Sequence, residues 1–275
     1  MTAQARPSPA EVYEEYFVPA IFDPLTRLLL DAAPPQPDEG VLDIACGTGV
    51  VARRAATLVG PAGAIVGMDL NPGMIEVARR LSAADGVRVE FRQGDAQELD
   101  LPDGGFDRVV CQQGVQFLAD REAGLREMRR VLVPGGTAVL AVWQGPERHP
   151  LYTAMAEVEA PHLTAFGLAV TMEDLTAPFS LGDPADLRAL LTEAGFREVD
   201  ITEASIDARF ATPERFVERL EYAYAAVVPA FVEDPEMFTQ YLANITSETT
   251  ALVEAYRDGD HVIVPMHTHI AVARN

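Results

Sequence analysis

One stretch constrains the fold of this chain more than any other: an apolar segment that runs into a glycine-rich turn and then into a helical segment. Residues 40–45 read GVLDIA, and residues 49–59 carry the apolar spacing of a helix. Gly47, Gly49 and Ala52 between them fit G-x-G-x-x-G/A, in which glycines let the backbone approach a ligand at a helix N-terminus. The pattern predicts a ligand-binding strand–turn–helix unit, and by itself it leaves a nicotinamide, a flavin or another adenosine ligand open.

The alternation of strand and helix continues along the chain. Further strands are expected at residues 64–69, 87–95, 106–113, 137–143, 197–204 and 261–274. Helices are expected at residues 9–31, 72–82, 121–132, 182–196 and 213–258. Such alternation implies right-handed crossovers. We therefore expect an α/β fold: a Rossmann-like, doubly wound, mostly parallel seven-stranded sheet with an antiparallel last strand and a helical lid.

Proline-rich and irregular segments suggest how the chain is divided. Four parts are expected: an N-terminal helical lid segment at 1–39, a binding core at 40–145, a lid insertion at 146–181, and a C-terminal completion of the core at 182–275 with a helical insertion at 213–258. The two insertions leave from the carboxyl ends of strands, where open α/β sheets bind ligands. The aromatic residues Phe166, Phe179 and Phe238 and the segment 222–232 suit an apolar ligand and suit ordinary packing equally.

Composition excludes several classes of function. The net charge of −21 repels nucleic acid and anionic membrane surfaces. All 21 basic residues are arginine, so a Schiff-base lysine and a phosphate-loop lysine are both excluded. No apolar run approaches the roughly 18 residues of a membrane span, the N-terminus lacks a signal peptide, and the 2 cysteines fit a disulfide-free chain. We expect a cytoplasmic protein with a small-molecule substrate, no nucleic-acid partner and no membrane insertion; a homodimer stays open.

Two acidic positions narrow the ligand. Asp69 ends the second expected strand, where a carboxylate accepts hydrogen bonds from ribose hydroxyls; the alternative is a solvated turn residue. Asp95, in Gly94-Asp95-Ala96 after the third strand, suits the exocyclic amine of adenine, or else simply caps the residues after it. No second glycine fingerprint follows. The sequence therefore favours an adenosine ligand without a diphosphate.

At this point the sequence resembles a known family, the class I S-adenosylmethionine-dependent methyltransferases, especially the ubiquinone/menaquinone-biosynthesis-like branch. The resemblance depends on VLDIACGTG, VGMDLNPGMIEVAR, RQGDAQELDLPDGGFDRVVCQQGVQFLAD and EMRRVLVPGG, which cover residues 40–143 in the right order. The match is looser outside that core. The resemblance implies S-adenosyl-L-methionine as cofactor and S-adenosyl-L-homocysteine as product.

The resemblance also implies a set of cofactor-binding residues. In chain order they are Tyr16 as a closing side chain, Ala45, Gly47, Thr48 and Gly49 at the methionyl tail, Asp69 at the ribose, Leu70 and Met74 along the adenine, Gly94, Asp95 and Ala96 at its edge, Gln112 through its backbone carbonyl at the ammonium, and Gln116 near the methionyl group. Relatives often have glycine where Ala45 stands. For Tyr16, Leu70 and Met74 ordinary core packing is the alternative.

The chain departs from its relatives after the fourth strand, where many of them carry Leu-His-His and this chain has Val115-Gln116-Phe117. No acid–base histidine is available there, so the catalytic residues stay unknown. On the substrate side we expect Gln113, His149 and His269, with a surface loop as the alternative for His149. His267 and His269 share a strand face, but no third ligand is evident, so no metal is expected.

The expected function is methyl transfer to O, C or N of a small, hydrophobic metabolite, aromatic or isoprenoid-derived, as in natural product biosynthesis. The rival is a protein of the same fold that binds the cofactor without transferring methyl, as a pericyclase-like or hydroxylase-like enzyme or as a regulatory subunit.

Overall fold

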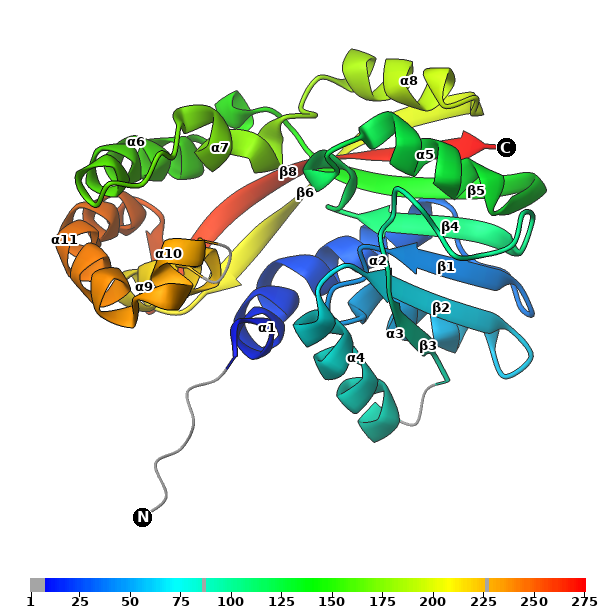
Figure 1. The fold of residues 1–275 in the computed structure, drawn as a ribbon, viewed down its shortest axis with the longest axis horizontal. Helices are drawn as coiled ribbons and strands as arrows, with labels where there is room; N and C mark the ends of the chain where they lie inside the picture. Colours follow the sequence, from blue (N-terminus) through cyan, green and yellow to red (C-terminus); the bar gives the residue numbers. More distant parts are fainter. Residues whose placement is uncertain (1–7, 86–87, 226–227) are drawn as a thin grey trace. The chain divides into compact units, whose positions relative to one another are not determined.

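The structure is a computed structural model that describes residues 8–85, 88–225 and 228–275. The chain divides into two compact units, which we call the core unit and the helical unit (Figure 1). The core unit comprises Phe22–Gly145, Pro178–Ser205 and His267–Asn275. The helical unit comprises Met1–Ile21, Pro146–Ala177 and Ile206–Met266, apart from the residues outside the described ranges.

The described strands form one eight-stranded sheet with the order β3-β2-β1-β4-β5-β8-β6 and the short β7 paired to β8; β1 to β5 belong wholly to the core unit, β7 belongs to the helical unit, and β6 and β8 have residues in both. The strands are β1 (Gly40–Ile44), β2 (Ala64–Asp69), β3 (Glu90–Gln93), β4 (Phe106–Gln112), β5 (Leu132–Trp143), β6 (Arg197–Phe210), β7 (Arg257–Asp258) and β8 (His261–Arg274). The pairs among β1 to β5 are parallel, and β8 is antiparallel to β5. The expected mostly parallel α/β sheet is confirmed, including the antiparallel last strand, but it has eight strands and not seven, because the two-residue β7 is added.

Helices cover both faces of this sheet (Figure 1). Those of the core unit are α2 (Asp23–Ala32), α3 (Val50–Val59), α4 (Pro72–Asp85), α5 (Arg121–Arg130) and α8 (Pro184–Glu193), with the short η2 (Val115–Phe117) and η4 (Ala177–Phe179). As the sequence predicts, α8 begins with Asp183 as N-cap, whose carboxylate accepts a hydrogen bond from Ala185 N at 2.7 Å. Gly195 follows the helix with φ +94°.

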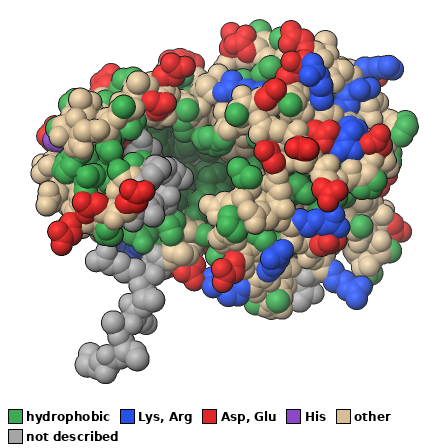
Figure 2. Space-filling view, viewed as in Figure 1, with side chains coloured by type: hydrophobic (Ala, Val, Ile, Leu, Met, Phe, Trp, Pro, Cys, Tyr) green, Lys and Arg blue, Asp and Glu red, His purple; other side chains and the backbone are tan. Residues whose placement is uncertain are grey.

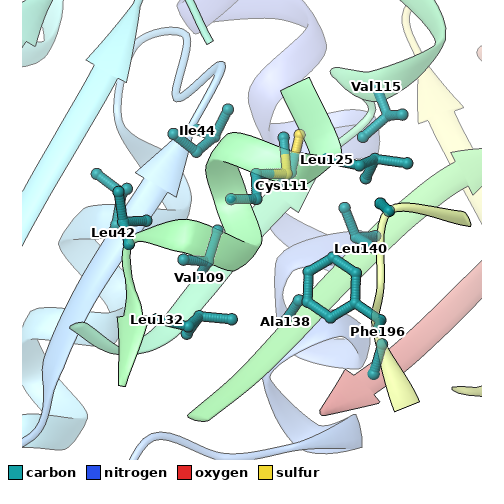
Figure 3. Close-up of a cluster of buried hydrophobic side chains, with 14 of the residues drawn as sticks. Leu42, Ile44, Val109, Cys111, Val115, Leu125, Leu132, Ala138, Leu140 and Phe196 are labelled. Atoms are coloured by element: carbon teal, nitrogen blue, oxygen red, sulfur yellow. The ribbon is translucent and has the colours of Figure 1, made fainter. Parts of the chain in front are cut away.

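The core lies between the sheet and the helices α5 and α8 (Figure 3). Leu42, Val109 and Leu140 come from three neighbouring strands, and each is fully buried. Leu125 of α5 packs on the same cluster. Because these strands are buried on both faces, their sequences are continuous apolar runs without alternation, as is typical of parallel sheets.

The helical unit has an apolar core of its own. Its helices are α1 (Pro9–Val12), η1 (Tyr13–Phe22, a π-helix that runs into the core unit by one residue), α6 (Pro150–Ala165), α7 (Met172–Thr176), α9 (Pro213–Ala225), α10 (Pro229–Glu233) and α11 (Pro235–Glu254), with η3 (Pro146–Arg148). Leu163 of α6, Phe231 of α10 and Tyr241 of α11 meet in a buried cluster.

Several expected boundaries shift. β5 begins at Leu132, not at residue 137, because Leu132 pairs with Phe106 before an irregularity in the register. β6 runs on to Phe210, six residues past its expected end at 204. The expected helix over 213–258 is divided into α9, α10 and α11, and its last two residues form β7 instead. Val87 of the third expected strand and Val227 of that helix lie outside the described residues.

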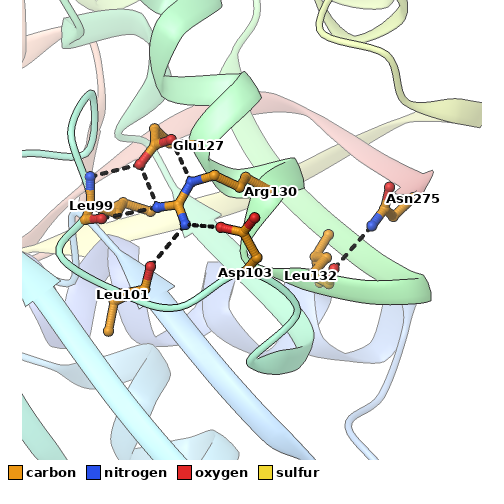
Figure 4. A network of polar contacts seen from close by, with 7 residues as sticks. All are labelled: Leu99, Leu101, Asp103, Glu127, Arg130, Leu132 and Asn275. Atoms are coloured by element: carbon orange, nitrogen blue, oxygen red, sulfur yellow. Dashed lines mark hydrogen bonds and ion pairs between the residues drawn. The ribbon is translucent and has the colours of Figure 1, made fainter.

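A polar network joins α5 to the loop before β4 (Figure 4). Arg130 donates hydrogen bonds to Asp103 at 2.6 Å, to Leu101 O at 2.8 Å and to Leu99 O at 2.9 Å. It also donates to Glu127, and this carboxylate accepts a hydrogen bond from Leu99 N at 2.8 Å. The guanidinium of Arg130 lowers the pKa of Glu127, so the network holds an ion pair at neutral pH. The network contains none of the expected site residues.

Candidate functional site

The glycine turn after β1 has the backbone shape that its sequence predicts. Ala45, Gly47 and Gly49 have φ of +53°, +55° and +84°, in the left-handed region. A Cβ on Gly49 would lie 2.5 Å from Phe91 Cζ, so any other residue there would force the Phe91 ring to shift. The positive φ of Ala45 is a conformation that glycine adopts more readily than alanine, which agrees with the glycine that the family resemblance leads us to expect there.

Asp69 holds this turn in place. Its Oδ2 accepts a hydrogen bond from Gly47 N at 2.8 Å, and its Oδ1 accepts one from Asn71 N at 2.8 Å. Each carboxylate oxygen keeps a further lone pair. The structure therefore brings Asp69 and Gly47 together at the carboxyl ends of β1 and β2, as the sequence predicts.

The turn and the strand before it contain two buried oxygen atoms without a protein partner. Thr48 Oγ1 and Asp43 Oδ1 have no hydrogen bond within the described chain, and both side chains are buried. Asp43 Oδ2 accepts from Ala52 N at 2.9 Å. Burial, reinforced by the charge of Asp69, raises the pKa of Asp43 to about 8. Sequence reasoning missed Asp43, although an acidic residue inside an apolar strand was a signal.

The residues expected at the adenine edge are linked through the backbone to Asp69, which holds the glycine turn. Gly94 N donates to Asp69 O at 3.0 Å, and a Cβ on Gly94 would lie 2.8 Å from Met68 Sδ. The Asp95 carboxylate accepts hydrogen bonds from Gln97 N at 2.9 Å and from Gln97 Nε2 at 3.0 Å, which lower its pKa. Asp95 thus makes the capping contacts of the alternative interpretation, and adenine recognition by its side chain stays a prediction.

Apolar side chains are exposed beside these polar groups. Leu70, directly after Asp69, is 66% exposed, whereas Met74 in the first turn of α4 is half-buried. Ala96 packs against the core cluster. Phe117 at the end of η2 is 60% exposed. Exposed apolar side chains close to the carboxyl ends of strands, as Leu70 is, suit contact with a ligand.

At the tip of β4 three glutamines have different roles. The Gln112 side chain is used within the fold, since it donates to Phe22 O at 3.1 Å and accepts from Thr26 Oγ1 at 3.1 Å. Gln113 has φ +56°, a left-handed value that is uncommon for a residue with a side chain. Its amide accepts a hydrogen bond from Gln116 Nε2 at 2.9 Å. Backbone strain and buried amides therefore coincide at this strand end.

The expected histidines lie in different units. His269 of β8 is 3% exposed in the core unit, and its Nε2 lies 2.9 Å from Gly182 O. Since a carbonyl only accepts, Nε2 carries the proton and Nδ1 keeps a lone pair, for which the described residues supply no donor. His149 precedes α6 in the helical unit and is 1% exposed, so the surface-loop alternative for His149 is wrong.

Tyr16 also belongs to the helical unit. Its ring packs on Phe210 at a centroid distance of 5.5 Å and on Phe17 at 5.3 Å, and burial raises its pKa to about 12. The packing interpretation describes these contacts, and closure of Tyr16 over the cofactor stays a prediction. The aromatic residues expected to line a lid pack together as well: Phe231 lies 5.5 Å from Phe238 and 5.0 Å from Tyr241.

The described residues contain neither a metal-site cluster nor a helix that could cross a membrane. No cluster of three or more His, Cys, Asp or Glu side chains there has the arrangement of a metal site. None of the described helices combines the length and apolar character that a bilayer crossing requires. Cys46 and Cys111 are both free and buried, and burial raises the pKa of each thiol.

These residues fit the cofactor that the sequence implies. The left-handed turn brings backbone close to a ligand, Thr48 and Asp43 keep unused oxygen atoms beneath it, and Asp69 keeps lone pairs for ribose hydroxyls. An acidic, amide-rich lining suits a ligand that carries an ammonium and a sulfonium.

Comparison with known proteins gives one consistent result. A family model described as a methyltransferase domain matches residues 41–136. The ubiquinone/menaquinone biosynthesis C-methyltransferase UbiE of Ectopseudomonas mendocina is 32% identical over 181 residues, which cover 63% of this chain and 71% of that protein. The matched segment contains the glycine turn, Asp69, Gly94 and the tip of β4.

Solved structures show the same fold at low identity. The phosphoethanolamine N-methyltransferase 2 of Haemonchus contortus has a TM-score of 0.59 at 18% identity, over 99% of this chain and 59% of that one. The [4+2]-cyclase SpnF has a TM-score of 0.52 at 23% identity, over 92% of this chain and 80% of that one. A methyltransferase and a cyclase thus share this fold, which alone does not fix the reaction.

Proposed function

Because the chain belongs to the class I S-adenosylmethionine-dependent methyltransferases, in the ubiquinone/menaquinone-biosynthesis-like branch, we propose that its methyl acceptor is a small, largely apolar metabolite. The enzyme uses S-adenosyl-L-methionine as methyl donor, and its sulfonium supplies an activated methyl group. The observation that supports an apolar acceptor is the exposure of Phe117, at 60%, in η2 shortly after the end of β4. The net charge of −21 also disfavours an anionic acceptor.

We assign the cofactor to the carboxyl ends of β1, β2, β3 and β4. The glycine turn would receive the methionyl tail, and Asp69 would bind the ribose through the lone pairs that Gly47 N and Asn71 N leave free. Leu70 would lie along the adenine. The residues of this chain would bind and orient the two reactants and exclude water from them. Such positioning is how an enzyme accelerates transfer from an activated donor.

The atom that is methylated is part of the proposal. The relatives that establish the family are C-methyltransferases by name, so carbon is the atom that the comparison favours. If the acceptor loses a proton, His269 Nδ1 is the unused lone pair in the core unit that suits a base. Gln116 stands where the family resemblance leads us to expect a histidine in many members, and an amide does not act as a base at neutral pH.

The experiment uses S-adenosylmethionine labelled in its methyl group, incubated with the protein and a panel of phenols, quinols and isoprenoid-derived compounds. Label in an organic extract, with stoichiometric S-adenosylhomocysteine, is the expected result, and NMR of the product identifies the methylated atom. Label confined to charged, water-soluble acceptors would contradict an apolar acceptor. Cofactor binding without turnover on any acceptor would favour the non-transferring rival.

A further inference from the structure

A row of buried hydrogen bonds connects the last strand of the sheet to the tip of β4. Gln116 Nε2 donates to Gln113 Oε1 at 2.9 Å, and Gln113 Nε2 donates to Thr268 Oγ1 at 3.1 Å. The Thr268 hydroxyl donates to Val142 O at 2.7 Å. The side chains of Gln113, Gln116 and Thr268 are 7%, 3% and 0% exposed, so water does not compete for these bonds.

The last acceptor fixes the direction of the whole row. Val142 O is a carbonyl and only accepts, so the Thr268 hydroxyl donates its single hydrogen to Val142 O. Its oxygen can therefore only accept a hydrogen bond from Gln113. Gln113 must then turn its NH2 group to Thr268 and its oxygen to Gln116. Gln116 in turn uses its NH2 group on Gln113, and its own oxygen is left at the end of the row.

The described residues supply no hydrogen-bond donor to this terminal oxygen. Gln116 Oε1 is buried and makes no hydrogen bond to any described residue. A buried acceptor without a donor costs free energy, because it loses its hydrogen bond to water and gains none in return. The row therefore fixes the orientation of an acceptor, and none of the described residues supplies its donor.

The place of Gln116 indicates which donor completes the row. Gly114, two residues earlier, packs on the glycine turn so closely that a Cβ on it would lie 2.6 Å from Ala45 Cβ. Residues 112–118 read QQGVQFL and contain no carboxylate. This segment can therefore offer a cationic group only carbonyl and amide oxygens, whereas the carboxylates near the turn are those of Asp43 and Asp69.

We propose that Gln116 Oε1 accepts a hydrogen bond from the methionyl ammonium of the cofactor, and that Thr268, acting through Gln113, is the positioning residue that keeps the amide oxygen, and not the NH2 group, at the free end of the row. An ammonium has three N–H donors and no acceptor, so it binds the oxygen end of an amide and is repelled by the NH2 end. The inference rests on the proposed function, since it needs the cofactor in the glycine turn.

The test compares two ligands on the full chain by calorimetry. S-adenosylhomocysteine carries the ammonium, and 5′-methylthioadenosine has the same nucleoside and thioether without the amino acid. Gln116→Met keeps the length and removes the acceptor. We expect it to bind S-adenosylhomocysteine about tenfold more weakly than the wild type does, with unchanged affinity for methylthioadenosine. That unchanged affinity also shows that the variant is folded.

A second pair of variants tests the row itself. Thr268→Val removes the hydroxyl and frees both amides to turn over, so it should lose affinity for S-adenosylhomocysteine alone. Thr268→Ser keeps the hydroxyl and should bind S-adenosylhomocysteine with the affinity of the wild type.

Three outcomes would overturn the inference. One is equal affinities of Gln116→Met and the wild type for S-adenosylhomocysteine, and another is an equal loss for both ligands. The third is full affinity in Thr268→Val, which would remove the positioning role. A wild-type protein that binds neither ligand would instead refute the proposed site, and this inference with it.

Discussion

At the scale of single residues, the candidate site depends on a few specific side chains and glycines. Asp69 links Gly47 N to Asn71 N, and thereby joins the glycine turn to the start of α4. Gly49 leaves space for the ring of Phe91. Asp69 acts through the hydrogen bonds it accepts, whereas Gly49 acts through the absence of a side chain. We therefore expect different effects from replacing them.

Replacing Asp69 with alanine should weaken cofactor binding at least tenfold, about 1.4 kcal/mol. The variant loses the expected ribose acceptor and the anchor of the turn together. Calorimetry with S-adenosylhomocysteine measures the effect, and Asp100→Ala, at an exposed position of the core unit, is the matched control. Unchanged affinity in Asp69→Ala would remove its ribose role.

Replacing Gly49 with alanine should lower the free energy of unfolding by roughly 2 to 4 kcal/mol, because a left-handed backbone cost adds to a clash with Phe91. Gly135→Ala is the control: its φ is +81° with no atom within 4 Å of the added Cβ, so it should lose only roughly 1 to 2 kcal/mol. Urea denaturation measures both. Equal losses would mean that Phe91 moves aside without cost.

At the scale of elements, helix packing in the helical unit depends on a pair of buried acids. Glu159 of α6 and Glu221 of α9 are 8% and 1% exposed. Burial raises the pKa of both, and the charge of Glu159 raises that of Glu221 further. The two carboxyls therefore interact with at least one of them protonated, and ionising both would place like charges inside the unit.

The sign of the pH dependence follows from these raised pKa values. The folded protein holds protons that the unfolded chain releases above its ordinary glutamate pKa of 4.5. This contribution to stability is thus complete below pH 4.5 and declines as the pH rises through the folded pKa values.

Glu221→Gln should remove much of that decline and raise the melting temperature of the helical unit at pH 8 relative to the wild type. Glu218→Gln, at an exposed position of the same helix, is the control and should change little. Calorimetric melts between pH 5 and pH 9 provide the comparison. Identical pH profiles for Glu221→Gln and the wild type would contradict a protonated pair.

At the scale of the whole molecule, the acidic excess is spread over the surface. Red acidic side chains lie among blue arginines on the face shown in Figure 2. Some of the arginines are held in ion pairs, such as Arg108 with Glu39 at 3.1 Å and Arg92 with Glu90 at 2.7 Å. The excess of 42 acidic over 21 basic residues leaves a net charge of −21 that repels itself.

Salt should therefore stabilise this protein. Raising NaCl from 0.01 M to 0.1 M shortens the screening length from about 30 Å to about 10 Å, so the melting temperature should rise. The same step at pH 5, where protonation of carboxyls reduces the net charge, should raise it less. A fall in melting temperature at pH 7 would mean that surface ion pairs outweigh the net repulsion.

The sequence by itself determined the order of strands and helices, the glycine turn and the acidic residue after β2. These depend on local patterns: apolar runs of strand length, glycines at fixed spacing, and an N-cap aspartate before Pro184. The family resemblance over residues 40–143 came from the same segments.

Only the tertiary structure decided which polar groups are already used and which are free. Gln112 and Asp95 have partners within the fold, whereas Gln116 Oε1 and Asp43 Oδ1 have none in the described chain. Thr268 stands 155 residues from Gln113, so no local pattern links the two. The orientation of an amide depends on the donors and acceptors around it in space, and the fold brings those together from strands that the sequence keeps far apart.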